Sequence, residues 1–185
     1  GFIVSFIIAM ILGVIAGNIP QFATFFKPLI GVIKAVPTAA LVFLFLVMSG
    51  SRYAPIYIVF LISFPILYES FLGGITSVPK EINDALKVDS ANAFRGIIKV
   101  KIPIAFPYVI VGLASSFALS LKSEIMAEII TGDTGYGLGS AISMYRNSDP
   151  SDLTPIFAIA LIAIVFIVII DLIGLLINTF YKKER

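Results

Sequence analysis

Three ionisable side chains stand close together at one end of a long apolar stretch. Lys122, Glu124 and Glu128 fall in the stretch from Ile102 to Glu128. Placing such a group in hydrocarbon costs about 2.5–3.5 kcal/mol, so it normally faces a bundle interior or an aqueous path. Glu124 and Glu128 share a helix face, because side chains at i and i+4 are neighbours. All three are candidates to line a solute path, or else they pair with one another or extend to the membrane surface.

Two more carboxylates lie within apolar stretches of the chain. Glu69 is near the end of its stretch and is expected at the interface between membrane and water. Asp171 is the deepest ionisable group, and it is expected to face protein and not lipid.

A glycine-rich segment, from Gly132 to Gly139, superficially resembles a phosphate-binding loop. It follows an apolar stretch, no strand precedes it, and no Gly anywhere in the chain is followed by Lys, so a P-loop is excluded. A tight turn is the expected structure, and its part in gating a pore is open. The chain has no Cys and no His, which excludes thiolate metal sites and His-based nucleophilic catalysis. No cofactor is expected. With no nucleotide site in the sequence, the chain is not expected to be an enzyme, and any ATP hydrolysis is expected in a separate partner subunit.

The composition indicates a protein that crosses the membrane several times. Of 185 residues, 59% are hydrophobic and 13% are charged. A soluble domain has about 45–50% apolar and about 25% charged residues. The net charge of +2 is too small for a nucleic-acid-binding protein. The expected fold class is an all-α membrane protein, a polytopic helical bundle.

The apolar stretches predict five spans within a single transmembrane domain covering residues 1–185. A bilayer core of about 30 Å requires about 20 apolar residues in a helix. The second span reaches this length only if it starts near Leu29, and Pro65 is expected to kink the third. The spans are Gly1 to Ile19, Leu29 to Gly50, Tyr53 to Gly73, Ile102 to Glu128, and Leu153 to Tyr181.

Basic residues set the expected orientation. The segment from Val78 to Lys101 holds five of them, and the tail adds Lys182, Lys183 and Arg185. The segment from Ile129 to Leu153 has Arg146 alone against three Asp residues. The positive-inside rule makes the first two segments cytoplasmic and the third external. Gly1 is then external, which predicts one further span upstream and six in all.

Small residues recur at helical spacing on two spans. Gly1, Ser5, Ala9, Gly13 and Gly17 follow one another on the first span. On the fourth span the set is Gly112, Ser116 and Ser120. Because small residues let helix backbones approach closely in lipid, these faces are expected to pack against other helices.

The expected cytoplasmic loop, residues 78–102, reads as two short amphipathic helices. Pro79 suits a first helical turn, and Ile82, Ala85 and Leu86 form an apolar face. The register breaks at Asp89 and Ser90, which favour an N-cap, and a second stripe follows at Phe94, Ile97 and Ile98. From the pattern alone, this loop either docks on a partner or lies on the lipid surface.

The loop resembles the signature loop of permease subunits of bacterial ABC importers. That pattern is Glu-Ala-Ala, three residues, Gly, nine residues, then Ile-x-Leu-Pro. Here Asp84-Ala85-Leu86 is followed at the same spacing by Ser90 and by Val100-Lys101-Ile102-Pro103. Leu86 and Ser90 depart from the pattern, and Ser adopts a positive φ less readily than Gly, so the turn is expected to differ locally. The resemblance extends over the chain, including Ile33 to Gly50.

Two further segments resemble the subgroup that handles nitrate, sulfonates and taurine. They are Ala127-Glu128-Ile-Ile and Gly135-Tyr-Gly137-Leu-Gly139. The resemblance implies the type I importer permease fold with six spans, in the bacterial plasma membrane. It implies cytoplasmic ATPase partners, an extracytoplasmic solute-binding protein and a second permease copy, with a homodimer expected. The loop would contact the ATPase through Asp84, Ala85, Leu86, Asp89, Ser90 and Phe94.

Two other functions are compatible with parts of the sequence. A secondary transporter or channel that works without ATP would need carboxylates deep in several spans, and only Asp171 clearly qualifies. A membrane scaffold subunit would not need the two-helix loop.

Overall fold

A computed structural model describes residues 1–88, 93–132 and 137–183, and within these ranges the chain forms helices and no strand. Asp89 and Ser90 lie outside the described residues. The helices are α1 (Phe2–Asn18), α2 (Pro20–Ala35), α3 (Thr38–Thr76), α4 (Lys80–Val88), α5 (Ala93–Gly96), the π-helical turn η1 (Ile97–Lys101), α6 (Ile102–Thr131), α7 (Leu138–Ser148) and α8 (Thr154–Lys183).

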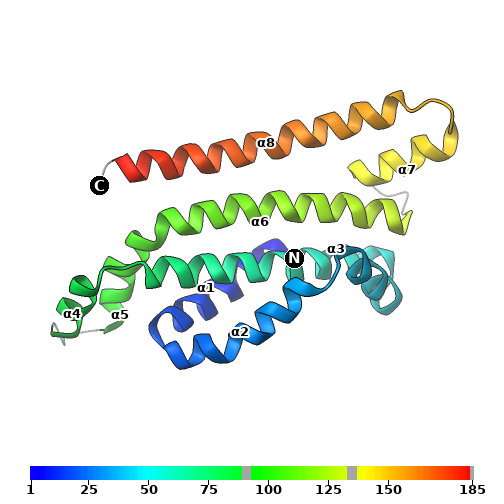
Figure 1. Cartoon of the computed structure of the whole chain (residues 1–185). Helices are drawn as coiled ribbons and strands as arrows, with labels where there is room; N and C mark the ends of the chain where they lie inside the picture. The colour runs from blue at the N-terminus through cyan, green and yellow to red at the C-terminus, as the bar shows by residue number, and fades with distance from the viewer. Residues whose placement is uncertain (89–92, 133–136, 184–185) are drawn as a thin grey trace.

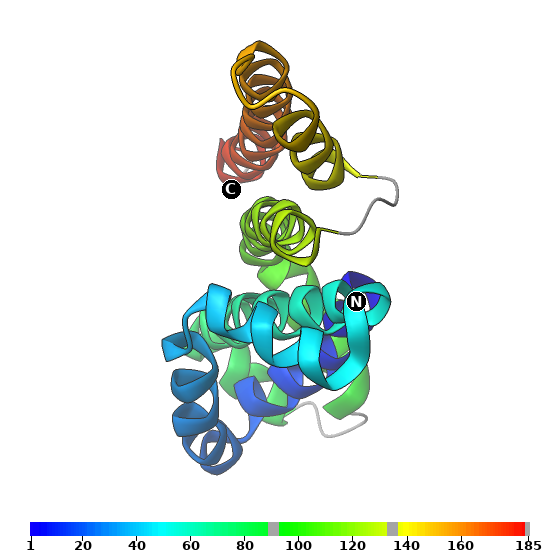
Figure 2. The same cartoon turned by 90° about the vertical axis from the view of Figure 1, so that its right-hand side faces the viewer.

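The long helices are stacked in layers. In Figures 1 and 2, α6 lies between α3 on one side and α8 on the other. The helices α1 and α2 pack on α3, and α7 packs against α6 and α8. The short helices α4 and α5 lie at one end of this bundle, and α7 lies at the opposite end (Figure 1). The arrangement confirms an all-α membrane bundle.

The small-residue face of α1 packs on α3, as the spacing predicted. Ser5 and Ala9 are fully buried. A Cβ added to Gly13 would lie 2.6 Å from the Phe71 Cβ, so no larger residue fits there. The backbones of α1 and α3 therefore approach closely, which is how small residues promote helix association in lipid.

The corresponding face of α6 also packs on α3. A Cβ at Gly112 would lie 1.9 Å from the Ser70 Oγ, so the glycine leaves room for that hydroxyl. Further along, the Ser63 and Ser120 hydroxyl oxygens are 2.6 Å apart in the buried interface. Ser116 is fully buried as well. Both small-residue predictions are confirmed.

The predicted second span, Leu29 to Gly50, is wrong as a single helix. The helix α2 ends at Ala35, and Val36 has extended backbone angles (φ −73°, ψ 125°). The cause is Pro37, which has no N–H to donate and disfavours helical angles at the residue before it. A second interruption occurs within α3 at Gly50 (φ 74°, ψ 168°), a conformation suited to glycine. Pro65, where a kink was expected, lies inside α3, and its backbone angles are helical.

Three helices in the described ranges are long and apolar enough to cross a membrane. They are residues Thr38–Thr76, Ile97–Thr131 and Thr154–Phe180. The apolar helix Phe2–Asn18 is 17 residues long, somewhat below the usual span length. The chain is therefore a multi-pass membrane protein, with fewer complete spans by this measure than the five predicted.

Candidate functional site

The first candidate site is the pair of short helices at one end of the bundle. The helices α4 and α5 lie where the two amphipathic segments were predicted. Asp84 and Ala85 are exposed on α4, whereas Leu86 is half-buried. A Cβ at Gly96 would lie 3.0 Å from Leu86 Cδ2, so Leu86 packs against the end of α5. Phe94 belongs to α5, and its side chain is outside the described part of the structure.

The same end of the bundle is tied to α1 through a side-chain contact. Lys101, the last residue of η1, donates a hydrogen bond of 2.6 Å from Nζ to the Asn18 Oδ1. The Asn18 Nδ2 in turn donates to the Val14 carbonyl oxygen at 2.8 Å. Movement of the α5–η1 segment would therefore displace the end of α1.

The second candidate site is at the opposite end, where α6 meets α7. The Glu128 Oε2 accepts hydrogen bonds from the backbone N–H groups of Gly139 at 2.7 Å and Ser140 at 3.3 Å. These N–H groups belong to the first turn of α7 and have no partner within that helix. A carboxylate there also interacts favourably with the helix dipole. Glu128 thus holds the start of α7 against α6.

Two glycines make room for this carboxylate. A Cβ at Gly137 would lie 2.1 Å from the Glu128 Oε1. At Gly139 it would lie 2.3 Å from the Ile125 carbonyl oxygen. Part of the glycine-rich segment therefore serves close packing of α7 on α6. Residues 133–136 lie outside the described ranges.

Within the described ranges, no hydrogen bond or ion pair joins Lys122, Glu124 and Glu128 to one another. Lys122 is exposed, and in the described ranges it forms no ion pair with either glutamate. Glu124 is half-buried, and its Oε2 is buried without a hydrogen-bond partner among the described residues. Glu128, by contrast, accepts hydrogen bonds from the start of α7.

A third set of polar groups lies between α2 and α3. The Lys34 Nζ is 2.8 Å from the Glu69 Oε2 and also donates to Oε1 at 2.9 Å. Glu69 was expected at the membrane interface by itself, and this partner was not predicted. A signal was present in the sequence: Thr24, Lys27 and Lys34 recur at helical spacing on one face of α2.

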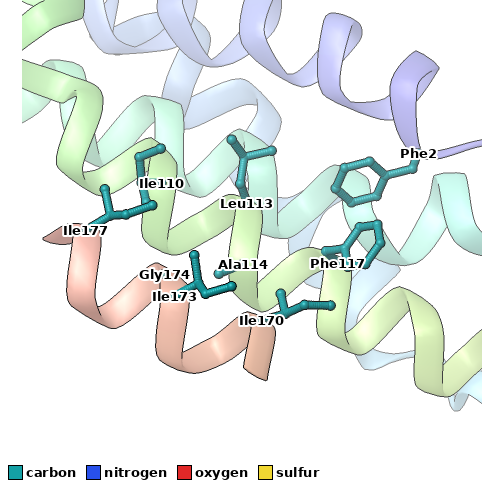
Figure 3. Close-up of a pocket in the computed structure, with 9 residues that line it drawn as sticks. All are labelled: Phe2, Ile110, Leu113, Ala114, Phe117, Ile170, Ile173, Gly174 and Ile177. Carbon is teal, nitrogen blue, oxygen red and sulfur yellow. The ribbon is translucent and has the colours of Figure 1, made fainter. Parts of the chain in front are cut away.

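The contact between α6 and α8 is apolar (Figure 3). A Cβ at Gly174 would lie 2.5 Å from the Ala114 Cβ, so the two helices cross there. Beside the crossing is an open groove of about 290 Å³. Its lining residues are Phe2, Ile110, Leu113, Ala114, Phe117, Ile170, Ile173, Gly174 and Ile177. This lining offers no polar side chain to a small polar solute.

Asp171 lies on α8, three residues before Gly174. It is half-buried on the side of α8 that carries the crossing point and the buried Ile167. The expectation that Asp171 faces protein therefore agrees with its place on the helix.

Comparison with known proteins identifies the family. The family described as binding-protein-dependent transport system inner membrane component matches residues 9–183. The nitrate import permease protein NrtB of Leptolyngbya laminosa is 26% identical over 181 residues, covering 96% of this chain and 60% of that protein. The bicarbonate transport system permease protein CmpB of Synechococcus elongatus is 29% identical over 140 residues, covering 74% of this chain and 50% of that protein.

A third relative belongs to a transport system for a different solute. The riboflavin transport system permease protein RibX of Chloroflexus aurantiacus is 28% identical, covering 72% of this chain and 48% of that protein. The chain thus spans about half to three-fifths of the length of these relatives. With its apolar helices it is a multi-pass component of the plasma membrane. The chain belongs to the family of binding-protein-dependent transport system inner membrane components.

Proposed function

We propose that this chain is the permease subunit of an ATP-driven ABC importer for a small solute of the nitrate, sulfonate or taurine class. Hydrolysis of ATP takes place in separate cytoplasmic ATPase subunits. An extracytoplasmic binding protein delivers the solute, and a second copy of the permease completes the pore. The family membership and the similarity to nitrate and bicarbonate permeases support this proposal.

The observation that carries the proposal is the exposed surface of α4 at one end of the bundle. Asp84 and Ala85 project from a short helix that is joined to the spans on both sides. Its neighbour η1 is bonded to α1 through Lys101 and Asn18. A partner bound to α4 could therefore move α1 and α6 together. We place the ATPase contact on Asp84, Ala85, Leu86, Asp89, Ser90 and Phe94.

A charge reversal tests this contact. The variant Asp84→Lys should reduce recovery of the co-expressed ATPase with the purified permease at least about tenfold. Placing like charges opposite each other across an interface costs several kcal/mol, and the reversal would bring a positive charge against any group that pairs with Asp84. Asp149→Lys is the matched control, since Asp149 is an exposed carboxylate in the connection between α7 and α8. Equal recovery of the ATPase with both variants would count against the contact.

The orientation is tested independently of any partner. The chain has no cysteine, so a single cysteine introduced at Ala85 or at Ser148 is the sole labelling site. In intact cells a maleimide that does not cross the membrane should label the Ser148→Cys variant and not the Ala85→Cys variant. The reverse pattern would place α4 outside and exclude contact with a cytoplasmic ATPase.

Lys122, Glu124 and Glu128 are placed near the outer half of the solute path in this proposal. Glu124 has a buried carboxylate oxygen without a partner in the described ranges, which makes it the residue best suited to meet a solute or a water. Glu128 would act through α7, which it holds. Lys122→Gln and Glu124→Gln should lower solute uptake while the amount of protein in the membrane stays constant. Unchanged uptake by both variants would remove them from the path.

A further inference from the structure

We propose that the cavity between α2 and α3 binds an oxyanion group of one negative charge. This proposal stands on the cavity itself and does not depend on the transport role. The helix α2 lies beside α3 (Figure 1), and the space between them measures about 560 Å³. That volume is in the range of small-molecule sites, about 300–1,000 Å³.

The walls of the cavity combine apolar and polar groups. One face of α2 and a short segment of α3 supply them. The residues are Ala23, Thr24, Lys27, Ile30, Gly31 and Lys34 from α2, with Tyr68, Glu69 and Leu72 from α3. Five of these nine residues carry polar groups and the others are apolar. Ligand sites likewise combine apolar walls with placed polar groups.

The charges of the cavity leave one positive charge uncompensated. Lys34 pairs with Glu69, whereas Lys27 has no ion pair among the described residues. Both partners of the pair are about half exposed, at 49% and 47%. Ion pairs of such exposure are weak, so Lys34 can exchange Glu69 for another anion at little cost. A ligand with one negative charge would neutralise Lys27 and would share Lys34 with Glu69.

A buried hydroxyl group in the same wall lacks an acceptor. Tyr68 is 2% exposed, and its Oη has no hydrogen-bond partner in the described part of the chain. Buried polar groups are normally hydrogen-bonded. The Tyr68 O–H and the two ammonium groups are donors, and an oxyanion is a ligand that offers acceptors to such groups. A cation would give Lys27 no partner and would be repelled by it, and Glu69, the carboxylate in this wall, is already paired with Lys34.

The oxyanion can come from a free solute or from the headgroup of an anionic phospholipid. The two sources share the chemistry that the cavity recognises, and the lipid composition of the preparation separates them. Trifluoromethanesulfonate is a suitable probe, because it has one negative charge, three acceptor oxygens and a small apolar body. Its binding to the purified chain in nanodiscs of phosphatidylcholine can be followed by fluorine NMR.

Lys27→Gln and Tyr68→Phe should each weaken binding of the probe about tenfold, the usual effect of losing one hydrogen bond to a charged group. Lys99→Gln and Tyr57→Phe are the matched controls outside the cavity and should change binding less than twofold. Glu69→Gln should tighten binding, because it releases Lys34 to the anion. If the Lys34–Glu69 pair served the fold alone, Glu69→Gln would not tighten binding of the probe.

Competition by phosphatidylglycerol in the nanodisc would assign the site to a lipid headgroup. Binding that is the same with and without phosphatidylglycerol would assign it to a free anion. Wild-type binding that does not saturate would overturn the proposal. Equal binding by the wild type, the Lys27→Gln variant and the Glu69→Gln variant would also overturn it. Both substitutions are at exposed side chains.

Discussion

The backbone N–H of Gly139 donates a hydrogen bond of 2.7 Å to the Oε2 of Glu128. The carboxylate that caps α7 therefore comes from α6, eleven residues earlier in the chain, and not from a residue next to the helix start. Because the same oxygen also accepts from Ser140, one side chain fixes both the position and the direction of α7.

Loss of this cap should loosen α7. Removing a helix N-cap costs about 0.5–2 kcal/mol, so Glu128→Ala should speed amide hydrogen exchange at Gly139 and Ser140. Glu128→Gln keeps an oxygen that can accept from both N–H groups and should show a smaller increase. Exchange measured by mass spectrometry on the α7 peptide compares the two. If the Ala and Gln variants exchange alike and as slowly as the wild type, the cap contributes nothing.

Uptake by the same two variants separates positioning from solute contact. If Glu128 acts by holding α7, Glu128→Gln retains most of the uptake and Glu128→Ala does not. If the negative charge meets the solute, both variants lose uptake equally. The first pattern is expected.

The close approach of α7 to α6 should not tolerate a side chain at Gly139. In Gly139→Ala the new Cβ would meet the Ile125 carbonyl oxygen at 2.3 Å, and that oxygen belongs to the α6 backbone. The α7 helix must shift, at a cost of about 1–3 kcal/mol. Gly73→Ala is the control, since a Cβ there meets nothing within 4 Å and alanine favours a helix by about 0.5–1 kcal/mol. The thermal unfolding temperature should therefore fall for Gly139→Ala and rise for Gly73→Ala.

The packing of α3 on α6 depends on which of two facing positions carries the side chain. Gly112→Ser alone would drive its Cβ into the Ser70 hydroxyl and should lower the free energy of unfolding by about 1–3 kcal/mol. The exchange variant, with Ser70→Gly and Gly112→Ser together, should recover much of that loss. Unfolding by denaturant in a double-mutant cycle measures the coupling. Additive effects of the two substitutions would show that the positions do not share one space.

Acid should weaken the connection between α7 and α8. The side-chain hydroxyl and then the backbone N–H of Ser151 hold the pKa of Asp149 below its usual value, and Thr154 does the same for the pKa of Asp152. Because both folded-state values are lowered, the ionised groups stabilise the connection above their unfolded pKa of about 3.9. This stabilisation is lost as the pH falls through the folded values.

Hydrogen exchange at the Ser151 and Thr154 amides, measured as a function of pH and corrected for the intrinsic rate, reports this change. Protection at these amides should fall in the acid range in the wild type. The Asp149→Asn and Asp152→Asn variants should lose that pH dependence at the amide concerned. Protection that stays constant down to pH values below both groups would contradict the lowered pKa values.

Much of the fold follows from the period of the sequence. The face of α1 that carries Ser5 and Ala9 and the face of α6 that carries Ser116 are buried, as expected of small residues at helical spacing that let helix backbones approach closely. The two helices of the loop followed from the same reasoning. The break at Gly50 did not, because an isolated glycine within a helical pattern does not reveal whether the chain uses its positive φ.

The candidate sites were predictable only in part, because their partners are distant in the sequence. Glu69 and Lys34 are 35 residues apart, and spacing along one helix says nothing about a partner on another. The role of Glu128 was missed for the same reason: its contacts with α7 depend on how the chain returns after residue 132. Sequence spacing identified Glu128 as unusual, and the packing of α7 determines what it does.

Solute uptake into vesicles tests the central claim most directly. The permease is reconstituted with its binding protein and the bound solute, with or without the ATPase subunits, and uptake is measured with ATP supplied on the α4 side. The account predicts uptake only when the ATPase and ATP are both present, and its loss in the Asp84→Lys variant. Uptake at the full rate without the ATPase would contradict the account and favour an ATP-independent transporter or channel.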